Sequence, residues 1–359
     1  METILPTTFR SYSQILFKDF VGFSPREMFV CYNEKKEERS MTLKEQVLAE
    51  LEKHRGSDLS GQALAERFGV SRNAIWKAVN ALREDGHKIL SGLNRGYRLS
   101  ESDDKLSLAG IELFLRPETS PLATRVFHTL DSTNAEAHRL LARGENCPLL
   151  VLSEEQTAGR GRQGREFYSP EGTGLYMTLA VQPRMEFSQA ALLTTAAAVA
   201  VVQAIESLTD RHPAIKWVND IFLDGKKLGG ILTEATGDFE TGRVDTALIG
   251  IGLNVRTEVF PASLRGTAIS LQLSGLSRNR LAAEIVHRLL SSIARLPERA
   301  FLDFYRARCL ALGREIEFVR EGNVFRAFAE SIDDAGGLCL RYADGSRETL
   351  RAGEIHLRI

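Results

Sequence analysis

The sequence of 359 residues predicts an α/β (α+β) protein with three folded parts: a winged helix-turn-helix, a central mixed-sheet domain and a small C-terminal β-barrel. Three observations support this fold class. Capped helices and tight turns fill residues 41–103, strand-like and helix-like patterns interleave over 104–309, and short strand-like runs separated by turns fill 310–359. Residues 1–40 lack such a pattern and end in a charged run, so we expect a flexible extension or linker there.

The composition excludes several classes of function. Lysine and arginine number 46 against 47 aspartates and glutamates, which excludes a globally basic coat protein for nucleic acid but leaves a local basic face open. The four cysteines form no CxxC motif and the seven histidines form no HExxH motif, so we expect no metal site built from side chains, and reduced thiols in a cytoplasmic protein. The most apolar run, over 190–205, is too short and too mildly apolar to span a bilayer, so we expect no membrane partner.

The N-terminal part is predicted to hold three helices, each preceded by a capping residue, and two short strands. The capping residues are Thr42, Ser60 and Ser71, the second and third helices cover 61–68 and 72–84, and the strands cover 87–90 and 96–99. Gly69 lies between the second and third helices, where a tight turn favours glycine. This order of elements is typical of a winged helix-turn-helix.

The same part is locally basic, although the whole chain is nearly neutral. Residues 60–100 hold seven arginines and lysines against three acidic residues, which favours attraction to a phosphate backbone. The third helix would be the recognition helix. The candidate DNA-binding residues are Ser71, Arg72, Asn73 and Lys77 on that helix and Arg95 at the tip of the wing. We expect Trp76 to be a partly buried anchor, and the alternative for the whole module is a protein–protein or structural role.

The other two parts are predicted from periodicity and turn residues. In the central part the candidate strands are 125–129, 149–154, 175–181, 214–217, 221–223, 230–234 and 246–253, and the candidate helices are 134–143, 189–208, 278–296 and 298–308. In the C-terminal part the candidate strands are 315–320, 324–332, 338–342 and 347–350. The first set predicts a mixed sheet with helices, and the second predicts a small barrel.

A glycine- and arginine-rich loop is the first candidate for chemistry. Residues 159–165 read Gly-Arg-Gly-Arg-Gln-Gly-Arg and formally match GxGxxG, but a strand and a turn follow instead of the helix that a dinucleotide site needs. Glycines expose backbone N–H groups, and arginines donate forked hydrogen bonds to carboxylate and phosphate. The loop therefore favours a ligand that carries both groups, and a flexible basic surface loop is the alternative.

Two further clusters could complete such a site. Lys227 follows the segment 216–220, where it could neutralise a phosphate while Asp220 holds a metal or orients an amine. The alternative is an ordinary surface ion pair between them. The segment 131–134, Asp-Ser-Thr-Asn, places short hydrogen-bonding side chains at a helix N-terminus, where plain N-capping is the alternative.

Together these motifs resemble those of the bifunctional biotin–protein ligase and biotin operon repressor family (group II biotin protein ligases). The matching segments, in the family's order and spacing, are 131–134, 155–165, 169–170, 216–220, 227–232 and 250–255. The resemblance covers residues 41–359 and implies a biotin/lipoate ligase-type catalytic domain with an SH3-like C-terminal barrel. Residues 1–40 lie outside it.

The resemblance implies a reaction in two steps. Biotin and ATP with Mg²⁺ would give biotinyl-5′-AMP and diphosphate, and biotin would then pass to a lysine of a biotin carboxyl carrier protein, such as that of acetyl-CoA carboxylase. It further implies repression of biotin synthesis genes through operator DNA and a homodimer promoted by the ligand. Two rival readings are a lipoate- or octanoate-attaching enzyme of the same fold and a non-enzymatic transcription factor that senses a ligand.

The resemblance also assigns residues. The implied catalytic residues are Lys227, Arg160, Arg162 and Asp220. The residues implied to bind biotin or the adenylate are Ser132, Thr133, Asn134, Gln156, Gly159, Arg160, Gly161, Arg162, Lys227, Gly229, Trp217 and Asn219. Two positions depart from the family pattern: Gln163 stands where some relatives have arginine, which puts in doubt how tightly the loop retains the adenylate, and Val218 replaces a frequent proline.

Overall fold

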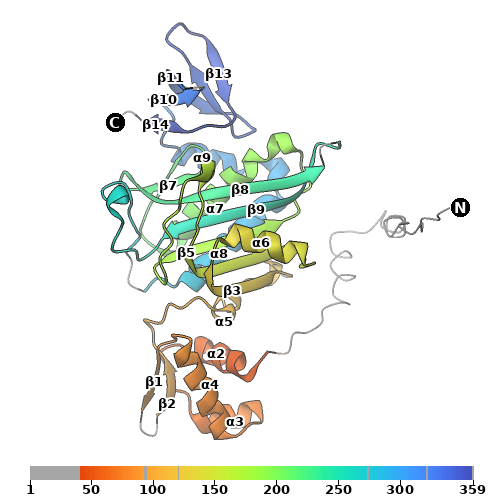
Figure 1. Cartoon of the computed structure of the whole chain (residues 1–359), viewed down its shortest axis with the longest axis vertical. Helices are drawn as coiled ribbons and strands as arrows, with labels where there is room; N and C mark the ends of the chain where they lie inside the picture. Colours follow the sequence, from red (N-terminus) through yellow and green to blue (C-terminus); the bar gives the residue numbers. More distant parts are fainter. Residues whose placement is uncertain are drawn as a thin grey trace, which may run out of the picture. The chain divides into compact units, whose positions relative to one another are not determined.

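The computed structural model describes residues 41–92, 95–119, 121–238, 240–272, 275–320 and 322–357. The extension expected over residues 1–40 lies outside the described residues, and so do two residues near the tip of the predicted wing, 93 and 94. Figure 1 shows the order of the elements along the chain.

The N-terminal part is a winged helix-turn-helix, as predicted. Its elements are α2 (Leu43–Lys53), α3 (Gly61–Phe68), α4 (Arg72–Glu84), β1 (Ile89–Gly92) and β2 (Gly96–Leu99). The hydroxyl of Ser60 accepts from the amide of Gln62 over 3.2 Å, and Gly69 closes the turn with a φ of 64°, in the left-handed region. Apolar side chains of all three helices share one buried cluster, which includes Val47, Leu64 and Val79.

The first wing strand begins two residues later than predicted. His87 is buried, and its Nδ1 lies 3.1 Å from Oδ2 of Asp103. The amide of Lys88 donates to the other carboxylate oxygen of Asp103 over 2.7 Å. Because Asp103 binds the His87 ring and the Lys88 amide, pairing with β2 starts only at Ile89.

The central part is a seven-stranded mixed sheet. Its strands are β3 (Ala123–Leu130), β4 (Leu149–Gln156), β5 (Gly174–Val181), β6 (Ala214–Lys216), β7 (Asp220–Leu223), β8 (Lys226–Asp238) and β9 (Arg243–Asn254), in the order β3-β4-β5-β9-β8-β7-β6. Only β3 and β4 are parallel, because α6 (Thr133–Ala142) connects them as a crossover. The strands β8 and β9 are longer than predicted, since they continue beyond the apolar core as one antiparallel ribbon.

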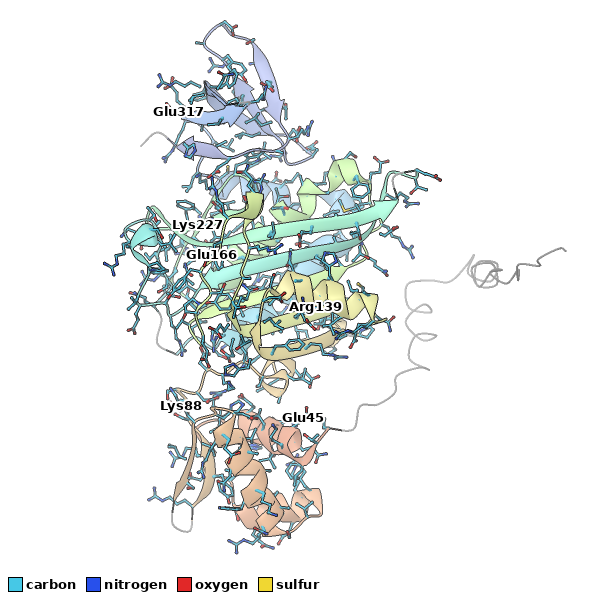
Figure 2. All side chains as sticks on the ribbon, in the orientation of Figure 1. Glu45, Lys88, Arg139, Glu166, Lys227 and Glu317 are labelled. Carbon is cyan, nitrogen blue, oxygen red and sulfur yellow. The ribbon has the colours of Figure 1, made fainter. Side chains whose placement is uncertain are left out.

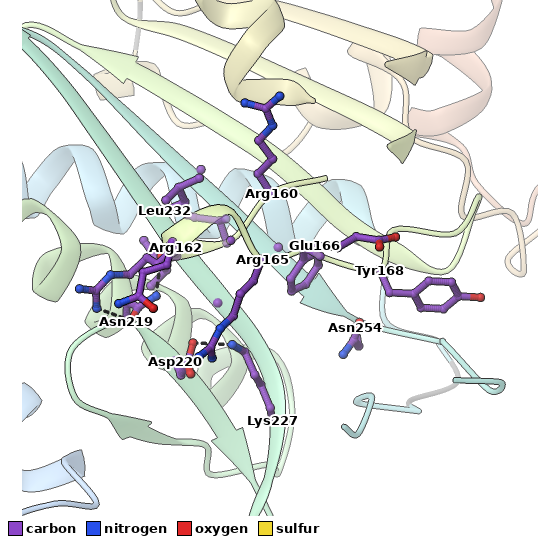
Figure 3. A pocket seen from close by; sticks show the side chains of 18 of the residues that line it. Arg160, Arg162, Arg165, Glu166, Tyr168, Asn219, Asp220, Lys227, Leu232 and Asn254 are labelled. Carbon is purple, nitrogen blue, oxygen red and sulfur yellow. Dashed lines mark hydrogen bonds and ion pairs between the residues drawn. The ribbon is translucent and has the colours of Figure 1, made fainter. Parts of the chain in front are cut away.

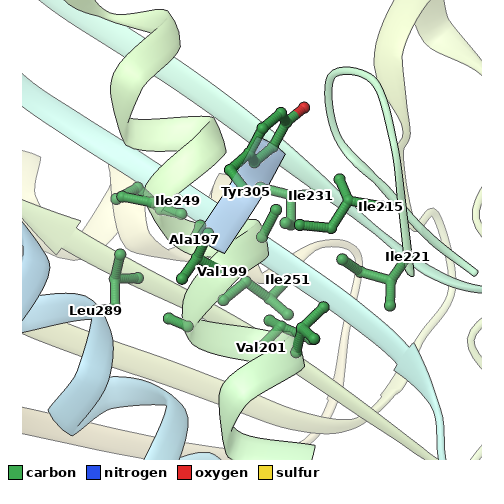
Figure 4. Packing of buried hydrophobic residues seen from close by; sticks show 14 of the residues in the cluster. Ala197, Val199, Val201, Ile215, Ile221, Ile231, Ile249, Ile251, Leu289 and Tyr305 are labelled. Carbon is green, nitrogen blue, oxygen red and sulfur yellow. The ribbon is translucent and has the colours of Figure 1, made fainter. Parts of the chain in front are cut away.

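Helices cover both faces of this sheet. On one face lie α7 (Ala191–Leu208) and α8 (Arg278–Ala294), and α9 (Phe301–Arg308) follows them. Figure 4 shows α7 packing through Val199 and Val201 near Ile231, Ile249 and Ile251 of the strands. Among the described helices α7 alone is long and apolar enough to span a membrane, yet 67% of its apolar window is buried within the protein. We therefore interpret α7 as a core helix.

The opposite face of the sheet carries α6. Leu140 and Ala137 of α6 pack against Val151, Ala180 and Leu248. Side chains alternate between the two faces of a strand. The residues of β9 that alternate with Ile249 and Ile251 are glycines, so the face opposite the apolar core has no side chains there.

The C-terminal part is a five-stranded antiparallel sheet in the order β13-β12-β11-β10-β14. Its strands are β10 (Glu315–Arg320), β11 (Asn323–Ile332), β12 (Leu338–Arg341), β13 (Arg347–Leu350) and β14 (Ile355–Leu357). Four of these were predicted, and β14 was missed because its three residues are too few for a pattern. Ile316 and Leu340 belong to the same buried cluster as the central sheet, so the packing does not mark a boundary between the two parts. The boundary at 309/310 remains a prediction.

A buried arginine joins the segment after the wing to the central sheet. The side chain of Arg278 is 2% exposed, and its Nε donates to Oδ2 of Asp104 over 2.9 Å. Its Nη1 donates to the carbonyl of Gly174 over 2.8 Å, and Nη2 lies 2.8 Å from Oε2 of Glu154. Buried charges are tolerated only when they are paired in this way.

Candidate active site

A cavity of about 310 Å³ opens on the α6 face of the central sheet, between β8, β9 and the glycine- and arginine-rich loop (Figure 3). Six parts of the chain line it. They are the start of α6, Gln156 at the end of β4, the loop 160–168, the β6–β8 segment with β9, the segment 260–268, and residues 353–354 of the C-terminal part. The lining holds five arginines and lysines against three acidic residues, so it favours an anionic ligand.

Glycines of β9 allow the other elements to approach the sheet closely. A Cβ atom on Gly250 would lie 2.4 Å from Oδ1 of Asn134, and one on Gly252 would lie 2.6 Å from the ring of Phe167. Neither distance is compatible with a side chain at these positions. The start of α6 and the loop aromatic ring therefore rest directly on the strand.

The N-terminus of α6 faces the cavity without a side-chain cap. Ser132 is the N-cap residue, but its hydroxyl makes no capping hydrogen bond. The carboxylate of Asp131 accepts from the amide of Ser132 over 2.8 Å. Hydrogen bonds from Arg139, above all, lower the pKa of Asp131 to about 2. Plain N-capping therefore does not account for Ser132, whose hydroxyl makes no capping hydrogen bond and lies in the cavity lining.

Amide and hydroxyl groups form the polar end of the cavity. Oε1 of Gln156 accepts from the amide of Thr133 over 2.8 Å, and its Nε2 donates to Oγ of Ser169 over 3.0 Å. Nδ2 of Asn134 donates to Oε2 of Glu234 over 2.7 Å, and Oδ1 accepts from the hydroxyl of Thr178 over 2.6 Å. This end suits a ligand with both donors and acceptors.

The loop arginines point in different directions. Nη1 of Arg162 donates to Oδ1 of Asn219 over 3.2 Å and to the carbonyl of Gly353 over 3.1 Å. Arg165 forms an ion pair of 2.6 Å with Glu354. In Figure 3 the side chain of Arg160 points away from these groups. The C-terminal part thus holds the loop at two points.

An ion pair lies at the charged end of the cavity. Nζ of Lys227, at the start of β8 (Figure 2), is 2.7 Å from Oδ1 of Asp220. Lys227 is 41% exposed, so its ammonium group remains accessible to a ligand. Burial, above all, lowers the pKa of the neighbouring Lys216. Trp217 is buried, and its indole donates to the carbonyl of Gly336 over 3.0 Å.

The structure brings most of the predicted ligand-binding residues to this one cavity. The predicted residues in the lining are Ser132, Thr133, Asn134, Gln156, Arg160, Gly161, Arg162, Trp217, Asn219, Asp220 and Lys227. Gly159 and Gly229 lie outside the lining. A Cβ atom on Gly159 would lie 2.6 Å from the carbonyl of Phe167, and one on Gly229 would lie 2.3 Å from the carbonyl of Gly252. Both glycines serve close backbone packing.

Sequence reasoning missed several residues of the site. The repeated glycines of the segment 250–252 were a usable signal for close packing, because they interrupt an apolar strand. Glu354 carried no signal, since 189 residues separate it from Arg165. Thr178 lies within an apolar strand and gave none either.

The predicted DNA-binding residues are all exposed; four lie at the start of α4 or along it, and Arg95 lies between β1 and β2. Ser71 caps this helix, and its hydroxyl accepts from the amide of Ala74 over 3.2 Å. Among the described residues no ion pair is found for Arg72, Lys77 or Arg95. The expectation that Trp76 is partly buried is wrong: it is 52% exposed, because Ile75 and its helical neighbours already fill the core.

Three protein families match the chain. The biotin/lipoate A/B protein ligase family matches residues 126–254, an HTH domain matches 44–98, and the biotin protein ligase C-terminal domain matches 311–358. These ranges correspond to the central sheet, the winged helix-turn-helix and the C-terminal sheet.

Similar proteins cover between about two thirds of this chain and nearly all of its folded parts. The chain is 36% identical over 315 residues to the bifunctional ligase/repressor BirA of Bacillus spizizenii, which covers 85% of this chain and 96% of that protein. It is 33% identical to the biotin–[acetyl-CoA-carboxylase] ligase of Mycobacterium tuberculosis, over 63% of this chain and 86% of that protein. The biotin protein ligase of Aquifex aeolicus, solved with biotin and ATP, superposes with a TM-score of 0.56 at 25% identity, over 66% of this chain and 98% of that chain.

Proposed function

Since this chain belongs to the biotin protein ligase family, we propose that it activates biotin with ATP and transfers it to a lysine of a biotin carboxyl carrier protein, as a biotin–[acetyl-CoA-carboxylase] ligase. One observation carries the proposal. A single cavity joins a polar end of hydroxyl and amide groups to a cationic end with Lys227 and Arg162. Biotin has a matching shape, with a cyclic urea at one end and a carboxylate at the other.

The cationic end would serve the first step. The biotin carboxylate attacks the α-phosphorus of ATP, a mixed anhydride forms and diphosphate leaves. Two anions must approach each other, so fixed cations at Lys227, Arg160 and Arg162 would lower the barrier. Asp220 would hold the Lys227 ammonium group in place, given their 2.7 Å contact. Trp217 and Asn219 would shape the nucleotide side.

The polar end would hold biotin through Ser132, Thr133, Asn134 and Gln156. In the second step the amine of the carrier lysine attacks the carbonyl of the anhydride, an amide bond forms and AMP leaves. The loop with Gly159 and Gly161 would cover the anhydride and exclude water, which would otherwise hydrolyse it. Gly229 would support the site through backbone packing.

Mg²⁺ would enter with ATP. Among the described residues no group of three or more histidine, cysteine, aspartate or glutamate side chains is arranged to hold a metal. A site with a single carboxylate fits Mg²⁺, because this ion is usually held by substrate phosphates and only one or two carboxylates. Asp220 is the candidate carboxylate, and the ion would supply neutralisation of phosphate charge.

The winged helix-turn-helix would make the protein a repressor of biotin synthesis genes. We assign contacts with operator DNA to Ser71, Arg72, Asn73 and Lys77 on α4 and to Arg95 on the wing. Among the described residues no ion pair is found for the three basic ones, Arg72, Lys77 and Arg95, so their charge is available for phosphate. The adenylate would act as corepressor by favouring a homodimer, and the protein would work in the cytoplasm.

ATP–diphosphate exchange tests the ligase proposal. Purified protein with Mg²⁺ is given biotin, lipoate, octanoate or no acid. Exchange with biotin alone supports the proposal, and exchange with lipoate or octanoate instead would assign the other substrate class. Folded protein without any exchange would refute adenylation and favour a sensor. A gel shift on the gene's own upstream DNA, with and without biotin and ATP, tests repression.

A further inference from the structure

A chain of hydrogen-bonding side chains runs from the surface of β8 to the polar end of the cavity. It starts at Glu234, which is exposed, and continues through Asn134, Thr178 and Thr133, which are buried. Nδ2 of Asn134 donates to Glu234, and the hydroxyl of Thr178 lies 2.6 Å from Oδ1 of Asn134 and 2.8 Å from Oγ1 of Thr133. Glu234 itself is not part of the cavity lining.

We propose that Glu234 is a positioning residue that sets the direction of the hydrogen bonds in this chain, so that Thr133 presents only lone pairs to the ligand. The inference rests on the proposed function, because it concerns how the site selects the cyclic urea of biotin. It gives a residue outside the cavity a part in substrate selection.

The direction follows from the number of hydrogens in each group. An ionised carboxylate only accepts hydrogen bonds, so the amide of Asn134 must turn its NH₂ toward Glu234 and its oxygen toward Thr178. The hydroxyl of Thr178 has one hydrogen, and Oδ1 of Asn134 takes it. Oγ1 of Thr178 can then only accept from Thr133.

Gln156, the other neighbour of the Thr133 hydroxyl, also presents an acceptor to it. Oε1 of Gln156 lies 3.2 Å from Oγ1 of Thr133 and also accepts from the Thr133 amide. The hydroxyl hydrogen of Thr133 is therefore shared between two acceptors inside the protein, Thr178 and Gln156. With Glu234 in place this hydrogen count leaves no side-chain donor to Oγ1 of Thr133 among the described residues, and its lone pairs face the cavity.

The resulting pattern matches a cyclic urea. Thr133 offers an acceptor for an N–H group, while the Ser132 hydroxyl and the second Nε2 hydrogen of Gln156 offer donors for the urea carbonyl. A fatty acid or a dithiolane has neither group and would leave these buried partners unpaired. Unpaired polar groups of a site reject the wrong ligand strongly.

Glu234→Lys tests the proposal, because an ammonium group only donates. It should turn the amide of Asn134, so that Nδ2 faces Thr178 and the Thr178 hydrogen goes to Thr133. We expect the KM for biotin in the exchange assay to rise roughly tenfold. The KM for ATP and kcat should stay unchanged. Asp245→Lys is the matched control, since it makes the same charge change on the same β8–β9 ribbon, outside the cavity lining.

A swap of the two polar partners provides a rescue. Glu234→Gln with Asn134→Asp places an NH₂ donor on β8 and a carboxylate beside Thr178, which restores the original direction. The double variant should recover the KM for biotin to within about threefold of the native protein. Asn134→Asp alone, with two facing carboxylates, should be the weakest binder.

Three outcomes are decisive against the inference or its basis. Equal KM values for biotin in Glu234→Lys and Asp245→Lys, in folded proteins, would overturn the positioning role. An equal rise in the KM for ATP would overturn it too, since it would indicate general damage to the cavity. Native protein that shows no exchange with biotin would instead refute the proposed function.

Discussion

Replacing Gly250 by alanine should damage both the fold and the polar end of the cavity. The new methyl group would lie 2.4 Å from Oδ1 of Asn134, whereas ordinary contacts begin at 3.4 Å. The amide must therefore move by about 1 Å, away from Thr178 and Glu234. One buried and one partly buried hydrogen bond, at about 1 kcal/mol each, would be weakened, offset by about 0.5 kcal/mol from the stiffer unfolded chain.

We therefore expect Gly250→Ala to lower the free energy of unfolding by about 1–2 kcal/mol and to weaken biotin binding roughly tenfold. Urea unfolding and calorimetric titration measure the two effects. Gly230→Ala is the control for stability, because its Cβ atom would lie 3.3 Å from the end of the Asp220 side chain, which can move. Native stability and native biotin affinity in Gly250→Ala would refute the close-packing argument.

Three further predictions concern other parts of the protein. Glu354→Gln removes the carboxylate that holds Arg165, so the adenylate should dissociate from the enzyme roughly threefold to fivefold faster. The free energy of unfolding should change by less than about 1 kcal/mol. The release of labelled adenylate measures the dissociation rate, and Glu317→Gln is the control. Trp76→Ala should weaken binding of operator DNA roughly tenfold in a gel shift and leave biotin transfer unchanged, because this exposed side chain lies among the candidate DNA contacts. An unchanged affinity for operator DNA would contradict this prediction. Asp131→Asn should abolish a small loss of stability that the native protein shows on acidification from about pH 4 to about pH 2. Arg139 lowers the pKa of Asp131 to about 2 in the folded protein, from an ordinary value of 3.8. The stabilisation by the ionised Asp131 is therefore complete above pH 3.8 and is lost as the pH falls through 2. Asp131 is 48% exposed, so the effect should stay below about 1 kcal/mol, and acid unfolding curves that coincide for the two proteins would contradict it.

The sequence predicted those features that depend on neighbours along the chain. Ser60, Gly69 and Ser71 defined the helix-turn-helix, because capping and turn formation need only a few consecutive residues. The glycine- and arginine-rich loop was predictable for the same reason.

Features that depend on distant segments could not be predicted in this way. The ion pair of Arg165 with Glu354 joins two parts of the fold, and nothing in either short segment indicates the other. The exposure of Trp76 also depends on distant packing, because helical spacing alone does not show whether another element covers this side chain. Tertiary contacts decide such positions.

The register of the sheet explains why one apolar pattern builds both the core and the site. Gly250 lies opposite Leu232 of β8 and Thr178 of β5, so Asn134 meets Thr178 and Glu234 above one point of the sheet. Ile249 and Ile251 fix this register from the other face, because they must remain in the apolar core. A slip of one residue would turn both isoleucines into the cavity and the glycines into the core. The hydrophobic alternation that stabilises the sheet therefore also positions the polar end of the cavity, and a substitution that shifts β9 should reduce stability and biotin affinity together.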